Sequence, residues 1–88
     1  MTTSPMNYRL SQHAREQMSR RDISRDMIER VMVSPDRILH QGDCIKVFQK
    51  IAITDKSKYL YRVFVNNCKE PALVITVYKT SKIEKYEN

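Results

Sequence analysis

The chain has 88 residues, 41% of them hydrophobic and 30% charged, which fits one globular domain with a single core and argues against a disordered chain. The longest apolar run, ALVITVY at 72–78, is too short to span a bilayer, and MTTSP at the N-terminus does not resemble a secretory signal. We therefore expect a single cytoplasmic domain over residues 1–88, without a membrane partner, in which residues 1–8 and 84–88 are loosely ordered.

Sixteen Lys and Arg residues against ten Asp and Glu give a formal net charge of +6 and an isoelectric point near 9.6. An excess of this size on a small domain attracts polyanions, of which nucleic acid is the commonest. An acidic protein would be attracted by the same field. The charge therefore favours a binding function, with RNA or an acidic protein as partner.

Two cysteines, Cys44 and Cys68, lack the spacing of a zinc site or of a disulfide framework. We therefore expect both to be free thiols. Nothing in the sequence indicates a metal ion or a cofactor.

Two helices are expected first. Ser11 can cap a helix over residues 12–20, and Ser24 can cap a second one that continues through RDMIERVMV until Ser-Pro at 34–35 ends it. Apolar residues recur at helical spacing in both segments: Leu10, Ala14 and Met18, then Met27, Ile28, Val31 and Met32. We interpret the pair as an αα-hairpin whose bend is filled by Ile23.

The pattern changes to strands after Pro35. The expected strands are RILH at 37–40, CIKVFQKIAI at 44–53, YLYRVFVN at 59–66 and ALVITVY at 72–78, with turns at QGD, TDKSK and NCKEP and a terminal turn or helix near SKIEKY. This order predicts an α+β fold, in which the N-terminal helical hairpin packs on one face of a four-stranded antiparallel sheet.

Arg62 stands out in the strand YLYRVFV because alternation places it on one face with Leu60 and Phe64. An arginine among apolar neighbours needs a partner, a ligand or access to the rim of the sheet. It could stabilise the charge on a pentacoordinate phosphorus, while Thr76 or Tyr78 positions or protonates a leaving oxygen. The alternative is that Thr76 and Tyr78 only favour the strand.

His13 lies one turn into the first predicted helix, where the helix dipole favours a neutral imidazole that can accept a proton. It is thus a candidate general base or acid at a phosphodiester. The alternative is a half-exposed histidine that packs against the sheet.

Basic residues on the helices and after the last strand are candidates for RNA binding, because guanidinium groups contact phosphate oxygens in pairs. The alternative is a solvated surface on which acidic neighbours pair with the arginines and lysines keep the sheet edge soluble. The candidates are Arg15, Arg20, Arg21, Lys79 and Lys82.

Taken together, HAREQMSRRDIS, MIERVMVSPD, YRVFV and VITVYKTSK resemble the bacterial family called domain of unknown function DUF4258, from about Ser11 to Lys82. That family is similar to RelE-like and BrnT-like toxins of type II toxin-antitoxin modules, which implies a RelE-like fold and an RNA site where the first helix meets the sheet. Relatives more often carry glycine at the position of Asp22, which is a departure from the family's pattern.

The resemblance assigns positions to several candidates. His13 and Met18 match the helix motif, and Arg20 or Arg21 matches the arginine that follows it. Arg62 matches the arginine of the Arg-Val strand, while Thr76 and Tyr78 match the final strand.

The function implied is that of a toxin that cleaves RNA without a metal ion, by attack of the ribose 2′-OH on the phosphate. A small acidic antitoxin, encoded next to it, would be its protein partner. A non-catalytic module that binds RNA or protein is the alternative, and a subunit that binds only protein is a third.

Overall fold

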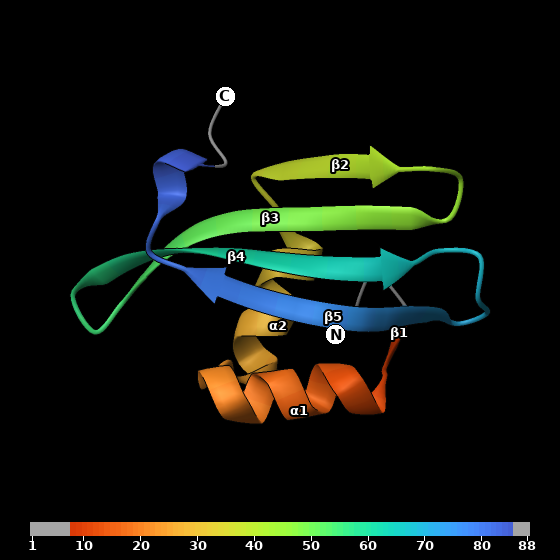
Figure 1. Ribbon diagram of the computed structural model, residues 1–88, viewed down its shortest axis with the longest axis horizontal. Coiled ribbons are helices and arrows are strands. Elements are labelled where there is room, and N and C mark those ends of the chain that lie inside the picture. Colours follow the sequence, from red (N-terminus) through yellow and green to blue (C-terminus); the bar gives the residue numbers. More distant parts are fainter. Residues whose placement is uncertain (1–7, 86–88) are drawn as a thin grey trace, which may run out of the picture.

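The computed structural model describes residues 8–85 of the chain, and residues 1–7 and 86–88 lie outside the described part (Figure 1). The elements are β1 (Tyr8–Leu10), α1 (Gln12–Arg21), α2 (Arg25–Val33), β2 (Arg37–Gln41), β3 (Ile45–Thr54), β4 (Ser57–Asn66), β5 (Ala72–Thr80) and a 3-10 turn, η1 (Ile83–Lys85). Both helices and the four strands from β2 onward lie where the sequence predicts them.

Local chemistry sets the helix ends. The Ser11 hydroxyl accepts a hydrogen bond from the Ala14 amide, and the Ser24 hydroxyl accepts one from the Met27 amide, so both predicted N-caps are confirmed. Helix α1 ends at Asp22, whose φ of 56° and ψ of 53° are left-handed. Helix α2 ends at Ser34, before Pro35, which cannot supply the next amide.

The predicted four-stranded antiparallel sheet is wrong. The sheet has five strands in the order β1-β5-β4-β3-β2 and is mixed, because β1 pairs in parallel with β5. The pairs are Tyr8 with Ala72, Arg9 with Leu73 and Leu10 with Val74. Three residues are too few to show the alternation by which a strand is recognised, so sequence reasoning assigned Tyr8 to the N-terminal tail.

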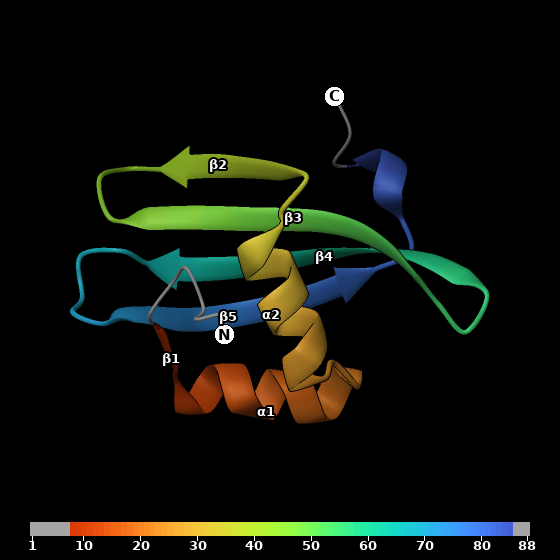
Figure 2. The same ribbon diagram turned by 180° about the vertical axis from the view of Figure 1, so that it is seen from behind.

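The helical hairpin on one face of the sheet is also wrong. Helix α2 crosses one face and contacts β3 and β4, whereas α1 lies beside the sheet along β5 (Figures 1 and 2). The reason is the end of β1: the Ser11 amide donates to the Val74 carbonyl at 2.9 Å, and its hydroxyl donates to the Ile75 carbonyl at 3.2 Å. Helix α1 therefore starts at the edge of β5.

The core lies between α2 and the sheet. Ile23 is 4% exposed and fills the bend between the helices, as predicted. The buried stripe of α2 is the predicted one, and Ala14 of α1 has no exposed surface. The side chains of this core are those of Leu10, Ala14, Ile23, Met27, Ile28, Val31, Met32, Phe48, Ala52, Tyr61, Val63, Val65, Val74 and Val77.

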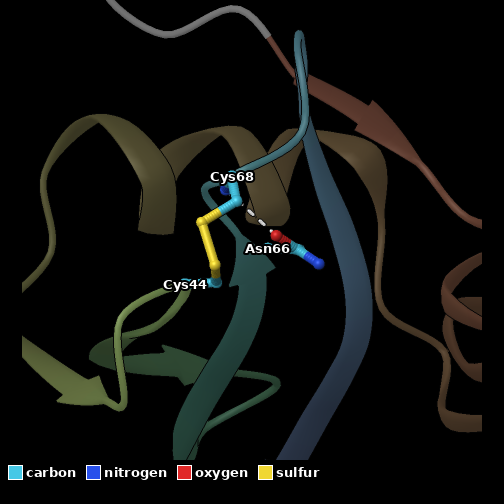
Figure 3. The surroundings of a disulfide bond; sticks show 3 residues. All are labelled: Cys44, Asn66 and Cys68. Carbon is cyan, nitrogen blue, oxygen red and sulfur yellow. Dashed lines mark hydrogen bonds between the residues drawn. A yellow bond between two sulfur atoms is a disulfide. The ribbon is translucent and has the colours of Figure 1, made fainter.

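Cys44 and Cys68 form a disulfide, so the expectation of two free thiols is wrong (Figure 3). Cys44 precedes β3 and Cys68 follows β4, and the pairing of Ile45 with Asn66 brings the two ends together, with a Cα separation of 5.1 Å. Twenty-four positions separate them in the sequence, and only the strand register reveals their proximity. Among the described residues, no helix is long and apolar enough to cross a membrane.

Candidate nucleic-acid interface

Arg62 lies on the sheet face opposite α2. Its neighbour Val63 is 1% exposed in the core beneath α2, and alternation along β4 therefore turns Arg62 and Phe64 the other way. The predicted split of this strand into two faces is confirmed. We call this surface the Arg62 face and define it by Arg37, Gln49, Arg62, Phe64, Thr76 and Tyr78.

Four of these residues form one row across the sheet. The strand register places Arg37 of β2 opposite Gln49 of β3, Gln49 opposite Arg62 of β4, and Arg62 opposite Tyr78 of β5. Residues in such a row are spaced by about 4.8 Å, the distance between neighbouring strands. The row thus aligns two guanidinium groups, an amide and a phenol ring at right angles to the strands.

Gln49 and Phe64 fix the Arg62 side chain. The Nε of Arg62 donates to the Gln49 Oε1 at 2.9 Å, and its guanidinium carbon lies 5.2 Å from the centre of the Phe64 ring. Gln49 is 5% exposed and is the one buried polar side chain among residues 8–84. The partner that the sequence required for Arg62 is therefore a glutamine on the adjacent strand.

Arg21 reaches the same row from the end of α1. Its guanidinium carbon lies 4.8 Å from the centre of the Tyr78 ring, and its Nε donates to the Gln17 Oε1 at 2.9 Å. A cation over an aromatic face is attracted by the ring quadrupole. Three arginines, Arg21, Arg62 and Arg37, thus alternate with Tyr78 and Gln49.

His13 is exposed on the first turn of α1, four residues before Gln17 and eight before Arg21. At about 100° per residue, eight residues turn the helix by about 80° beyond two full turns and advance about 12 Å along its axis. His13 therefore lies to one side of the line along α1 that carries Arg21, within about 20° of the direction of Arg20. Strand β5 lies between α1 and β4, so His13 and Arg62 come from elements that are not adjacent.

The remaining predicted site residues are distributed as follows. Thr76 is opposite Phe64 and shares a face with Tyr78. Lys79 turns to the other face, where its Nζ lies 3.5 Å from the Asp22 carbonyl oxygen and 4.8 Å from the centre of the Tyr59 ring.

Arg15, Arg20 and Lys82 are exposed outside the row. At about 100° per residue, Arg15 lies about 120° around the axis of α1 from Arg21, and Arg20 lies about 100° from it. Lys82 follows the end of β5.

Sequence reasoning missed Arg37, Gln49 and Gln17. A glutamine between Phe48 and Lys50, in a strand that is otherwise apolar or basic, was a usable signal for Gln49. The place of Arg37 depends on the register between β2 and β3, which the sequence alone does not give. Among the described residues, no three His, Cys, Asp or Glu side chains form a group that could hold a metal ion.

A protein-family model described as domain of unknown function (DUF4258) matches residues 10–79, which is most of the chain. This match covers both helices, the Arg62 row and the disulfide. No curated protein and no solved structure matches the chain.

Proposed function

Because this chain belongs to the family described as domain of unknown function (DUF4258), a description that assigns no activity, we propose its function from the Arg62 face: this surface binds RNA and cleaves it without a metal ion. The observation that carries the proposal is the row in which Arg21, Arg62 and Arg37 alternate with Tyr78 and Gln49. Guanidinium groups bind phosphate oxygens, and aromatic rings stack on unpaired bases.

RNA contains its own nucleophile, so the protein needs few catalytic groups. The 2′-oxygen attacks the adjacent phosphorus and loses its proton to a base, the bond from phosphorus to the 5′-oxygen breaks, and that oxygen takes up a proton. The products are a 2′,3′-cyclic phosphate and a free 5′-hydroxyl. In this scheme Arg62 stabilises the charge of the pentacoordinate phosphorane.

His13 serves as the base in this scheme, and Tyr78 as the acid or as the group that orients the leaving oxygen, with Thr76 beside it on β5. This role requires the RNA strand to run along α1 as well, over the roughly 12 Å that separate His13 from Arg21 along the helix axis. Tyr78 is the β5 member of the row: it is paired with Arg62 of β4, and the Arg21 guanidinium lies over its ring.

One observation favours a second candidate, a module that binds RNA without cleaving it. His13 is about 12 Å along the helix from Arg21, and β5 separates α1 from the strand of Arg62. A binding surface requires only the row of cations, whereas catalysis requires His13 to reach the same phosphate.

The biological setting that we propose is a type II toxin-antitoxin module in the cytoplasm, in which this chain is the RelE-like toxin. The net charge of +6 suits a small acidic antitoxin, which would compete with RNA for the Arg62 face. Cellular reductants keep most cytoplasmic thiols reduced, so we expect the dithiol form of Cys44 and Cys68 there.

The test uses the purified chain and a single-stranded RNA labelled at its 5′ end. We expect fragments that end in a 2′,3′-cyclic phosphate, and no cleavage where the nucleotide before the scissile bond is 2′-deoxy. Arg62→Met and His13→Asn should each slow cleavage about 100-fold. Arg30→Met, an exposed arginine of α2, is the matched control and should cleave normally.

The outcomes separate the candidates. Binding that falls steeply with salt, without a cyclic phosphate product and without any effect of His13→Asn, identifies the non-catalytic module. Absence of RNA binding at low salt, or equal binding by wild type and Arg62→Met, contradicts both candidates.

A further inference from the structure

We propose that an RNA strand crosses the sheet at right angles to its β-strands, from Arg21 on α1 to Arg37 on the edge strand β2, and that Arg37 is a phosphate-binding residue. This inference rests on the proposed RNA binding and names the path of the ligand across the surface. It also assigns a function to an arginine outside the motifs of the sequence.

The neighbouring rows of the same face favour a path across the strands over one along β4. On one side of the Arg62 row lies a row of Ile51, Leu60 and Thr80, and on the other side lies a row of Leu39, Val47, Phe64 and Thr76. Leu60 and Val47 are buried, so the surface of these rows on β2, β3 and β4 comes from the partly exposed Leu39, Ile51 and Phe64. A polyanion that followed β4 would therefore leave the guanidinium groups for apolar side chains, whereas one that crosses the strands stays on polar ones.

The length of the row matches a short segment of nucleic acid. From β2 to β5 there are three strand spacings, or about 14 Å, which is the length of about four stacked nucleotides. Arg37 and Arg62 are two spacings apart, with Gln49 between them, so they can contact different phosphates of one strand. Phe64 lies beneath the Arg62 guanidinium, and Tyr78 beneath that of Arg21.

An alternative role for Arg37 is protection of the sheet edge. β2 is the last strand in the order, and charged side chains on edge strands discourage pairing between copies. That role predicts self-association when the charge is removed, with RNA affinity unchanged. The binding role predicts weaker RNA affinity when the charge is removed, without self-association.

The experiment measures the affinity of the full-length chain for a fluorescent ten-residue 2′-O-methyl oligouridine, which cannot be cleaved, over a range of salt concentrations. Arg37→Met should weaken binding five- to tenfold at low salt. It should also make the slope of log K against log salt shallower by about 0.7, because one contact to a single-stranded phosphate is lost. Arg30→Met removes the same charge from the other side of the sheet and should leave the slope unchanged.

Oligonucleotide length gives a second measurement. With a two-residue oligouridine, too short to reach from Tyr78 to β2, Arg37→Met should bind as the wild type does. Loss of affinity at both lengths, or equal effects of Arg37→Met and Arg30→Met, overturns the path. The path is also overturned if Arg37→Met binds RNA as well as the wild type does but self-associates, as measured by light scattering.

The failure of the path and the failure of the proposed function look different. If Arg62→Met weakens binding but Arg37→Met does not, the surface binds RNA by another route and this inference is wrong. If the wild type does not bind, or Arg62→Met binds as well as the wild type, the proposed function itself is wrong and the inference falls with it. Arg37 is exposed, so its substitution leaves the core intact.

Discussion

Gln49 is buried and accepts a hydrogen bond from Arg62, so replacing it should leave that arginine less firmly held. Gln49→Met keeps the length of the side chain but removes the oxygen that accepts the Arg62 Nε–H at 2.9 Å. We expect faster hydrogen exchange at the Arg62 Nε, measured by NMR, a loss of about 1–2 kcal/mol of folding free energy and about tenfold weaker RNA binding.

A double-mutant cycle tests whether Gln49 acts through Arg62. In the Arg62→Met background, Gln49→Met should cause no further loss of RNA affinity. Full additivity of the two losses would contradict the positioning role. Gln12→Met, an exposed glutamine of α1, is the control for a general effect of the substitution.

Tyr8 makes the free energy of unfolding depend on pH in the alkaline range. Its hydroxyl donates to the Glu29 Oε1 at 2.8 Å, and burial, followed by the hydrogen bond and the negative charge of Glu29, raises the pKa of Tyr8 to about 12. The unfolded chain has a tyrosine pKa near 10.0. The stability that this shift provides is thus fully present below pH 10 and is lost as the pH rises towards 12.

We expect the free energy of unfolding of the wild type to fall more steeply between pH 10 and pH 12 than that of Tyr8→Phe. The comparison removes the contribution of lysines that titrate in the same range, since both proteins carry them. Parallel curves for the two proteins would show that Tyr8 ionises equally in the folded and unfolded states. The 13C chemical shift of the Tyr8 ring carbon bonded to the hydroxyl gives the same pKa directly.

At the scale of the element, helix α1 ends at Asp22, whose backbone conformation and charge are both unfavourable there. Asp22 has a φ of 56°, a conformation that costs non-glycine residues free energy, and its negative charge lies at the negative end of the helix dipole. Asp22→Gly should therefore raise the free energy of unfolding by about 0.5–1 kcal/mol in urea denaturation. Lys79 contacts the backbone oxygen of Asp22, which the substitution retains.

Asp22→Ala is the control for this prediction. Alanine removes the charge but keeps the Cβ that disfavours a left-handed backbone, so this variant should be less stable than Asp22→Gly. Equal stability of the two variants would mean that the charge, and not the backbone, accounts for the gain.

The elements were predictable to different degrees because their signals are local to different degrees. Ser11 and Ser24 predict helices because their side chains accept hydrogen bonds from amides in the first turn. The predicted bounds of both helices agree with the structure to within a residue. The strand β1 is too short for a pattern, and its partner β5 is more than sixty residues away in the sequence. Because β1 pairs in parallel with β5, the sheet is mixed and helix α1 begins at its edge.

At the scale of the whole molecule, the candidate site was predictable by residue type but not by position. Strand alternation and the family motif point to Arg62, Thr76 and Tyr78, and the structure places these residues on adjacent strands of one face. Arg37 and Gln49 belong to the same row through a register that depends on the turn around Gly42, which has a φ of 76°. The register between successive strands, and not composition, therefore determines which cations form a surface.

The disulfide joins the two turns at one end of the sheet, so breaking it should destabilise the fold (Figure 3). Cross-linking residues 24 positions apart restricts the unfolded chain, so reduction should lower the free energy of unfolding by about 3 kcal/mol. The measurement is urea denaturation with and without a reductant. The variant with both Cys44→Ser and Cys68→Ser should match the reduced wild type and be insensitive to the reductant.

RNA binding should survive this reduction. The pairs Ile45 with Asn66, beside the disulfide, and Gln49 with Arg62, in the cationic row, are four positions apart along β3, or about 13 Å. The ladder between β3 and β4 continues on both sides of the row and does not need the cross-link. We therefore expect RNA affinities of the oxidised and reduced chains to agree within about twofold while their stabilities differ, and a larger loss of affinity would show that the bond holds the row in register.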